Sequence, residues 1–393
     1  MNSAGVNNST LRLQNRRLIL RLIATGQCLS RIDIARETGL SKMAATNIIN
    51  EFISEGIVEE KEKQQVSGKG RNPILLGITP TAPKLLGVHI KRDFCEASVC
   101  DLRLSILGKK STPLTKGDPD RMIEEITGVI SSLLLDFKKE KILGIGVGAE
   151  GPVNTTLGRI LDPDDPEGIS TVDIKDVIAV KTGLPVFFLN EFDCAALAEL
   201  YFGKGKDLKD FIFIGLSRRI GASIVSNGGL YRSGTGLDCE FGHISIDYKG
   251  PLCKCGRRGC VGAYISGEGF KKELRKVAGE DLSFEEFCKK YEKSAPEETD
   301  RFIKDAVSKL SYGIANLVNT TCKQNYIIGC EGCFVPDRYI DEMKDLVSEM
   351  IVFKRSVRIN IVKSELHKKI SSGSCAAAVF DILLSRYTGK KEP

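Results

Sequence analysis

The sequence lacks the features of a membrane or exported protein. None of its apolar runs approaches the roughly 18–20 residues that a helix needs to cross a bilayer. Its start, Met1 to Thr10, lacks the basic and apolar regions of a secretory signal. The thirteen cysteines are an odd number, and nothing points to export. We therefore expect a cytoplasmic protein with no membrane partner.

Length and charge indicate several domains with different partners. The 393 residues suggest two or three domains, and 42% hydrophobic and 27% charged residues are ordinary for a globular protein. The net charge of +6 is uneven, because residues 1–80 carry 11 Lys and Arg against 7 Asp and Glu, whereas the rest carry 46 against 44. A basic head on a nearly neutral body predicts a polyanionic partner for the head only.

Residues 1–80, called the head below, predict a winged helix-turn-helix. One helix is expected over 16–25, Ser30 begins a second, and Ser41 caps a third. Apolar residues in the third helix recur at i, i+3 and i+4, so its polar face is free to read the major groove of DNA. A hairpin over 57–78 would add a basic wing. The residues expected to contact a double-stranded DNA operator are Ser41, Lys42, Thr46, Asn47, Lys69 and Arg71. The alternative is a helical bundle that contacts another protein.

The rest of the chain repeats one module. Three strands over 85–111, a helix near 119–138 and two further strands are followed by a new set that starts at Asp210. In this second set a third strand is expected around 243–247. Such duplication predicts an α/β body of two lobes with a ligand cleft between them. The expected domains are 1–80, 81–200 completed by a small-residue helix at 373–393, and 201–372.

The second lobe carries a pattern of metal ligands. Glu240-Phe-Gly-His243 is followed ten residues later by Cys253-Lys-Cys255-Gly-Arg-Arg-Gly-Cys260. Three thiolates and one imidazole form the ligand set of a closed, four-coordinate structural zinc site, and the two glycines allow tight turns between the thiols. The sequence therefore predicts structural Zn²⁺ bound by His243, Cys253, Cys255 and Cys260. The alternative is three buried cysteines and an unrelated histidine.

These motifs resemble the signature of the ROK family, named for repressors, open reading frames and sugar kinases. In that family a Glu-x-Gly-His segment runs into Cys-x-Cys-Gly-x-x-Gly-Cys. Ser30-Arg31-Ile-Asp-Ile-Ala35 and Gly70-Arg-Asn-Pro73 also resemble the head of its transcriptional-repressor branch, which includes xylose and N-acetylglucosamine repressors. The resemblance covers nearly the whole chain. It implies a winged helix-turn-helix followed by a two-lobed actin-like body of the sugar-kinase and ribonuclease-H type.

The resemblance also implies a sugar site and reveals departures from the family pattern. Asp164 and Glu191 replace a usual Asn and the usual catalytic Asp, and Gly262 stands where the family has a Glu. Met43, Ala44 and Asn47 replace usual Pro, Thr and Arg, so the operator sequence does not carry over. The positions expected to contact a sugar or sugar derivative are Gly151, Asp164, Asn190, Glu191, Glu240 and His243. Two alternatives stay open: a body regulated by a protein partner instead of a small ligand, and a Glu240 that is only a surface or capping carboxylate.

Both expected phosphate loops have lost their glycines. They read His89-Ile-Lys-Arg-Asp93 and Ser217-Arg-Arg-Ile-Gly221, and a Cβ at such positions penalises positive φ and fills the space that a phosphate needs. Together with Glu191 at the base position, these changes predict a former kinase that is no longer an enzyme. We expect a sugar-responsive DNA-binding regulator, a repressor of carbohydrate metabolism genes such as those for xylose, acting as a homodimer or homotetramer. The alternatives are a glucokinase-like ROK sugar kinase with a DNA-binding head and a zinc-stabilised scaffold without DNA.

Overall fold

The computed structural model describes residues 8–61, 74–161, 169–366 and 370–385. The chain forms two compact units. The first comprises Met1–Gly151, Leu157–Leu189 and Ser371–Pro393, and the second comprises Pro152–Thr156 and Asn190–Ile370. The domain boundaries expected at residues 80, 200 and 372 stay predictions.

The head begins each of its short helices at a serine. The backbone N–H of Asp33 donates to Ser30 Oγ at 3.2 Å, and that of Ala44 donates to Ser41 Oγ at 3.1 Å. Gly39, with φ of 68°, ends the helix between these two caps, because a left-handed residue costs glycine little. The elements are α1 (Asn8–Ala24), α2 (Arg31–Thr38), α3 (Lys42–Ser54), β1 (Val58–Lys61) and β2 (Leu75–Ile78).

The apolar face of α3 forms the core of the head. Ala45, Ile48, Ile49 and Phe52 are buried, as the periodicity predicts, and Ile53 is half-buried. Burial of such side chains contributes about 1.5–3 kcal/mol each, which fixes the helix on its neighbours. The antiparallel pair β1 and β2, in register Val58↔Ile78, follows α3 and supplies the hairpin of the winged motif.

The body of the first unit is a five-stranded sheet in the order β5-β4-β3-β6-β9. β3 pairs antiparallel with β4 and parallel with β6. The elements of this body are β3 (Lys84–Ile90), β4 (Phe94–Cys100), β5 (Ile106–Pro113), α4 (Pro119–Asp136), β6 (Ile142–Ala149), β8 (Arg159–Ile160), η1 (Ile169–Thr171), α5 (Ile174–Thr182), β9 (Val186–Asn190), α12 (Ser372–Val379) and η4 (Phe380–Ser385), whereas β7 (Val153–Asn154) belongs to the second unit.

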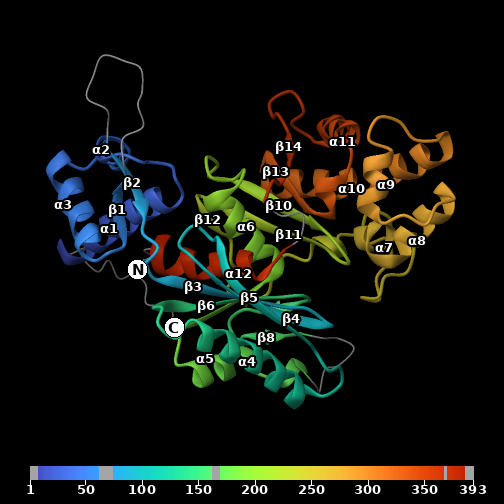
Figure 1. Ribbon diagram of the computed structural model, residues 1–393. Coiled ribbons are helices and arrows are strands. Elements are labelled where there is room, and N and C mark those ends of the chain that lie inside the picture. The colour runs from blue at the N-terminus through green and yellow to red at the C-terminus, as the bar shows by residue number, and fades with distance from the viewer. Residues whose placement is uncertain (1–7, 62–73, 162–168, 367–369, 386–393) are drawn as a thin grey trace. The chain divides into compact units, whose positions relative to one another are not determined.

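Two glycines let α12 lie directly on the first sheet, as Figure 1 shows. A Cβ at Gly87 of β3 would lie 1.8 Å from the Ser372 carbonyl oxygen, and one at Gly146 of β6 would lie 2.0 Å from that of Cys375. No side chain fits in that space, so the helix backbone approaches the strands because these positions are glycine. The described part of the expected small-residue helix is thus packed directly against the first sheet.

The second unit repeats this topology in a sheet ordered β12-β11-β10-β13-β14. β10 pairs antiparallel with β11 and parallel with β13, as β3 does with β4 and β6. The duplicated fold is therefore confirmed. The elements are α6 (Glu191–Phe202), β10 (Phe211–Leu216), β11 (Ile220–Ser226), β12 (Gly229–Leu230), η2 (Phe241–His243), α7 (Val261–Ile265), α8 (Gly267–Ala278), α9 (Phe284–Lys290), α10 (Glu297–Thr321), β13 (Asn325–Cys330), η3 (Glu331–Phe334), α11 (Asp337–Met350) and β14 (Asn360–Lys363).

The third strand of the second module does not lie at 243–247, so that expectation was wrong. Asn227 and Gly228 both have positive φ, 53° and 72°, which is the backbone of a type I′ hairpin turn. Such a turn returns the chain at once, and Gly229 and Leu230 pair with β11 as β12. The segment around His243 instead forms the short helix η2.

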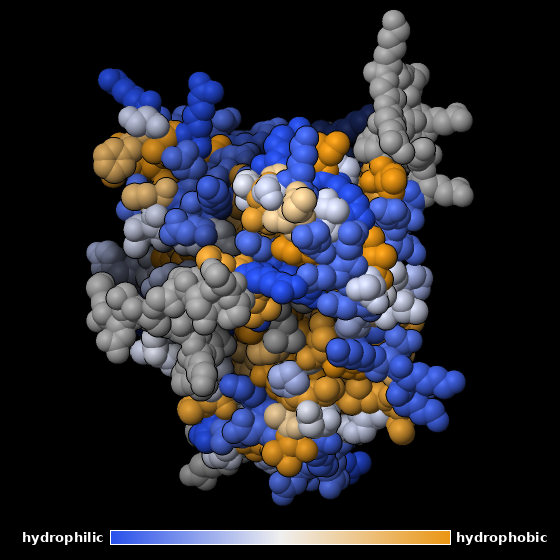
Figure 2. All heavy atoms as spheres, turned by 90° about the vertical axis from the view of Figure 1, so that its left-hand side faces the viewer, coloured by the Kyte–Doolittle hydropathy of each residue, from blue (hydrophilic) through white to orange (hydrophobic). Residues whose placement is uncertain are grey.

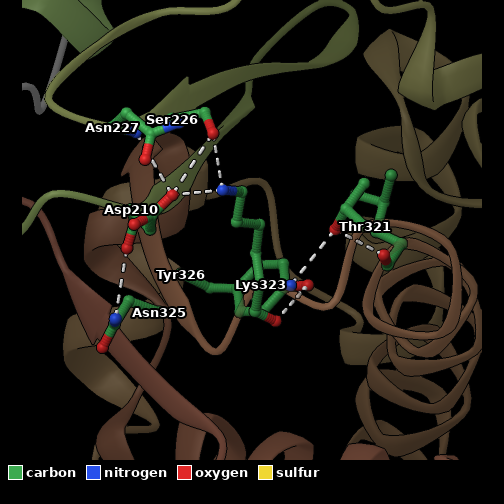
Figure 3. Close-up of polar contacts among 8 residues, drawn as sticks. Asp210, Ser226, Asn227, Thr321, Lys323, Asn325 and Tyr326 are labelled. Atoms are coloured by element: carbon green, nitrogen blue, oxygen red, sulfur yellow. Dashed lines mark hydrogen bonds and ion pairs between the residues drawn. The ribbon is translucent and has the colours of Figure 1, made fainter.

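One ionic network ties three strands of the second sheet together at one end (Figure 3). Lys323 Nζ contacts the carboxylate of Asp210 and donates to Ser226 Oγ at 2.8 Å. Asn325 Nδ2 donates to the Asp210 carbonyl oxygen at 3.2 Å. The hydrogen bond from Lys323 holds the pKa of the Asp210 carboxyl below its ordinary value. The network thus fixes the relative positions of β10, β11 and β13.

No helix in the described part of the chain is both long and apolar enough to cross a membrane. Hydrophilic and hydrophobic side chains are interspersed over the face drawn in Figure 2.

Candidate functional site

The four predicted metal ligands lie together in the second unit. The ligand atoms of His243, Cys253, Cys255 and Cys260 all lie within 4.8 Å of one another, and we call this group the Cys3His cluster. His243 Nδ1 lies 3.5 Å from Cys253 Sγ, and Cys255 Sγ lies 3.7 Å from Cys260 Sγ. The cluster offers three sulfur atoms and one nitrogen, and it could hold a metal ion.

Tight turns bring these ligands together. Gly256 and Gly259 have φ of 83° and 67°, and a Cβ at Gly259 would lie 1.7 Å from the Asp247 carbonyl oxygen. The backbone N–H of Gly256 donates to the Cys253 carbonyl at 3.0 Å. Both glycines are therefore required by the turns between the thiols, as the sequence predicts.

The thiols of the cluster differ in their ease of ionisation. The backbone N–H of Arg257 lowers the pKa of Cys255. Burial, followed by the neighbouring thiols, raises the pKa of Cys260 to about 11. The Cys260 thiol is thus hard to ionise in the bare cluster, and a bound cation would supply the positive charge that favours its thiolate.

One ring nitrogen of His243 faces the other residues of the Cys3His cluster, and its second ring nitrogen faces Glu240. Its Nδ1 lies beside Cys253, whereas its Nε2 lies 4.0 Å from Glu240 Oε2. Arg219 Nη2 lies 3.4 Å from the same carboxylate oxygen. A histidine whose Nδ1 binds a metal would present Nε2–H to Glu240, which links the Cys3His cluster to a half-exposed carboxylate.

A buried polar network lies around Asn190, at the N-terminus of α6. The Asn190 side-chain oxygen accepts from the backbone N–H of Asp193 at 2.7 Å, and Ser223 Oγ donates to Asp193. Asp238 lies close enough to the Asn190 side chain and to Asp193 for both to influence its pKa. Glu191 beside it is buried. Asn190 and Glu191 are therefore both buried, and the Asn190 amide is already engaged within the protein, so their expected contact with a sugar stays a prediction.

The two carboxyls of this network, Asp193 and Asp238, both have pKa values raised above the ordinary value. Burial raises the pKa of Asp193 to about 6. Burial and then the Asp193 charge raise the pKa of Asp238 to about 8. Two carboxylates in contact favour sharing a proton. The sequence analysis did not predict this pair of carboxyls. The only local feature that pointed to it was Asp193 in the first turn of a helix that Asn190 caps.

The polar face of α3 is displayed as predicted. Ser41, Lys42 and Asn47 are exposed, and Thr46 is half-buried. Arg31 of α2 supports this face, because its guanidinium donates to the Thr46 carbonyl at 3.3 Å and to Asn50 Oδ1 at 2.8 Å. Arg31 therefore positions the helix expected to read DNA, a role that the sequence motif alone did not indicate.

The second expected phosphate loop forms a closed turn. The Ser217 backbone N–H donates to the Arg219 carbonyl at 3.0 Å. Its one remaining glycine, Gly221, has a packing role, because a Cβ there would lie 2.2 Å from the Phe192 ring. In the first loop the backbone N–H of Arg92 donates to Glu150 at 3.3 Å.

Three predicted contacts cannot be placed, because Lys69, Arg71 and Asp164 lie outside the described residues. Gly151 lies in the first unit with φ of 121°. Its membership in one sugar site with Asn190, Glu240 and His243 stays a prediction.

The fold and site define a two-lobed protein of the sugar-kinase type that carries a winged helix-turn-helix head. The chain belongs to the ROK family, whose model matches residues 85–380, and a model described as winged helix-turn-helix DNA-binding matches residues 12–59. It is 24% identical over 394 residues to the xylose repressor of Caldicellulosiruptor bescii, covering 96% of this chain and 98% of that protein.

Solved structures show the same fold. A ROK family transcriptional regulator, described as a homologue of the Escherichia coli Mlc protein, has a TM-score of 0.76 at 23% identity and covers 95% of this chain and 98% of its own. A ROK hexokinase from Thermus thermophilus has a TM-score of 0.62 at 22% identity, with 76% of this chain and 97% of its own covered. The match to the regulator covers nearly the whole chain, including the head, whereas the match to the hexokinase covers about three quarters of the chain.

Proposed function

We propose that the protein is a sugar-responsive, DNA-binding transcriptional repressor of carbohydrate metabolism genes. The observation that carries this function is the joining of a ROK body to a head whose capped helix α3 presents a polar face. Side chains at the start of such a helix can reach base edges in the major groove. Lys42, Thr46 and Asn47 are the residues we expect to read bases, with Ser41 near a phosphate.

The DNA-binding claim has a direct test. Asn47→Ala should weaken binding to a selected operator by about 5- to 100-fold, because a bidentate contact to a base contributes about 1–3 kcal/mol. Asn319→Ala is the matched control, since Asn319 is exposed in the second unit. The measurement is fluorescence anisotropy with labelled duplex over a range of salt concentrations. Equal affinity of the two variants for the operator would contradict the assignment.

The effector we propose is a sugar or sugar derivative held by Glu240, His243 and the Asn190 region, with Gly151 and Asp164 as further expected contacts. Carboxylate, imidazole and amide groups on short rigid elements suit the hydroxyl pairs of a sugar. Glu240 is half-exposed and so accessible to a ligand. Relatives named xylose repressor make xylose the first sugar to test.

The metal we propose is zinc, with a structural role. Zn–S bonds of about 2.3 Å and Zn–N bonds of about 2.0 Å in a tetrahedron place two sulfurs about 3.8 Å apart and a sulfur and a nitrogen about 3.5 Å apart. The separations of 3.7 Å and 3.5 Å within the Cys3His cluster fit this geometry. Zinc held there would keep Nε2 of His243 directed toward Glu240.

We further propose that the body is not a kinase, that the protein is a dimer or tetramer, and that it acts in the cytoplasm. The kinase alternative has structural support in the similarity to the Thermus thermophilus hexokinase fold. Against it stand the closed Ser217–Arg219 turn and the Phe192 ring packed at Gly221, which leave no glycine-rich cradle in the second loop. Sugar-dependent hydrolysis or transfer from Mg-ATP by the purified protein would refute this part of the proposal.

A further inference from the structure

One large apolar side chain stands in the exposed polar face of α3. Met43, in the first turn of this helix, is 75% exposed, whereas the buried residues of α3 lie on its opposite face. Met43, Asn47 and Asn50 are all exposed and are spaced i, i+4 and i+7, so they form one row along the helix, which we call the α3 stripe. Single exposed apolar residues are common on protein surfaces, but this one lies where a winged helix-turn-helix meets the major groove.

Contacts from α2 hold the α3 stripe in place. The guanidinium of Arg31 donates to the Thr46 carbonyl at 3.3 Å and to Asn50 Oδ1 at 2.8 Å. The Asn50 amide is therefore partly engaged within the head. Asn47 and Met43 lie nearer the capped N-terminus of α3, where side chains of a recognition helix contact base edges. These two residues are thus the members of the stripe that are best placed to reach bases.

The chemistry of the α3 stripe suits an A·T pair better than a G·C pair. Helix α3 contains no arginine, the residue that most often reads guanine, and Lys42, its one basic residue, lies outside the stripe. The arginines packed beside α3 are paired with carboxylates: Arg16 Nη2 lies 2.8 Å from Glu55 Oε1, and Arg31 Nη2 lies 3.0 Å from Glu60 Oε1. An asparagine amide can bond bidentately to adenine, and thymine displays its C5-methyl group in the major groove.

We propose that Met43 reads a thymine methyl group in the operator, within about two base pairs of an adenine bonded by Asn47. The contact rests on the proposed DNA-binding function and deepens it, because it names a base feature that selects the operator. The two residues are about 6 Å apart along the helix axis, which corresponds to about two base-pair steps of about 3.4 Å. The unbranched, flexible thioether can pack against a methyl group whose position varies slightly.

The test is a uracil scan of a duplex that the zinc-loaded full chain selects from random sequence. Uracil in place of thymine removes one methyl group and keeps the hydrogen bonds of the base pair. At one thymine of each half-site this change should weaken wild-type binding about 4-fold in fluorescence anisotropy, as the loss of one buried methyl group predicts. The same change should leave the affinity of Met43→Ala unaltered, because alanine is too short to reach the methyl group.

Two further variants separate methyl recognition from a general change in the head. Met43→Leu should keep the sensitivity to uracil, because leucine supplies an apolar side chain of similar volume. Leu135→Ala is the matched control, since Leu135 is 69% exposed on α4 outside the head, and this variant should bind both duplexes as the wild type does. Met43→Ala should also keep the salt dependence of the wild type, since methionine neutralises no phosphate.

Two results would overturn the Met43 contact and leave the DNA-binding function intact. One is equal sensitivity of wild type and Met43→Ala to uracil at every thymine, and the other is a Met43→Ala variant that binds the selected duplex as tightly as the wild type. A wild type that selects no DNA sequence would overturn the proposed function, and the Met43 contact with it.

Discussion

Replacing Asp238 by Asn should stabilise the protein, and increasingly so as the pH rises. In the folded chain Asp238 and Asp193 are in contact, and the pKa of Asp238 is raised from 3.8 to about 8. Asparagine keeps the shape of the side chain. Its amide can donate to the Asp193 carboxylate and its oxygen can accept from Asn190, so the hydrogen bonds are retained while one buried charge is removed.

The raised pKa of Asp238 determines how the stability gained by Asp238→Asn should vary with pH. A carboxyl whose folded-state pKa is raised imposes no penalty below its unfolded pKa, a growing one between the two values, and a constant one above the folded value. At pH 7 a shift from 3.8 to about 8 would cost about 1.4 kcal/mol for each pH unit above 3.8, on the order of 4 kcal/mol. Because Asp193 shares the proton with Asp238, we expect Asp238→Asn to recover half of this penalty, about 2 kcal/mol of unfolding free energy at pH 7.

The assay is urea unfolding of zinc-loaded wild type and Asp238→Asn between pH 5.5 and 8.5. The difference in unfolding free energy should grow with pH and level off above about pH 8. Asp207→Asn, at an exposed position, is the control and should change little at any pH. A difference that does not vary with pH, or a variant less stable than wild type at pH 8, would refute this reasoning.

Three further predictions concern the metal, the helix α12 and the ionic network. Cys255→Ser should release zinc and lower the melting temperature by several degrees, which metal analysis and calorimetry would detect; a stable metal-free wild type would contradict it. Gly87→Val should cost about 2–4 kcal/mol in urea unfolding, because its Cβ would meet the Ser372 carbonyl oxygen, and no loss would show that α12 can move away freely. Lys323→Met should cost about 1 kcal/mol at pH 7. The lowered pKa of Asp210 means that this loss disappears as the pH falls through the folded-state value, and a loss unchanged at pH 3 would exclude the ion pair as its cause.

Local signals in the sequence predicted most of the fold. Ser30 and Ser41 cap helices because their hydroxyls satisfy free N–H groups, and this chemistry is visible in the residues themselves. The small residues from 373 onward likewise indicated a helix at the end of the first lobe, whereas the roles of Gly87 and Gly146 beneath it are visible only in the folded chain.

Features that depend on tertiary contact were harder to predict. The strand expected at 243–247 failed because the turn at Asn227 returns the chain immediately, so pairing ended at Leu230. The carboxyl pair was missed because Asp193 and Asp238 are far apart in sequence and meet only in the folded second unit. The four residues of the Cys3His cluster could be expected to lie together because their spacing is local and their chemistry is specific.

The most direct test of the sugar-responsive repressor is fluorescence anisotropy of the zinc-loaded protein on DNA selected by the protein itself, with and without a panel of sugars that includes xylose. The account predicts tight, salt-dependent binding to the selected duplex and a loss of at least about 10-fold in affinity with one sugar, a coupling of about 1.4 kcal/mol. Absence of sequence-selective DNA binding, or binding that no sugar changes, would contradict it.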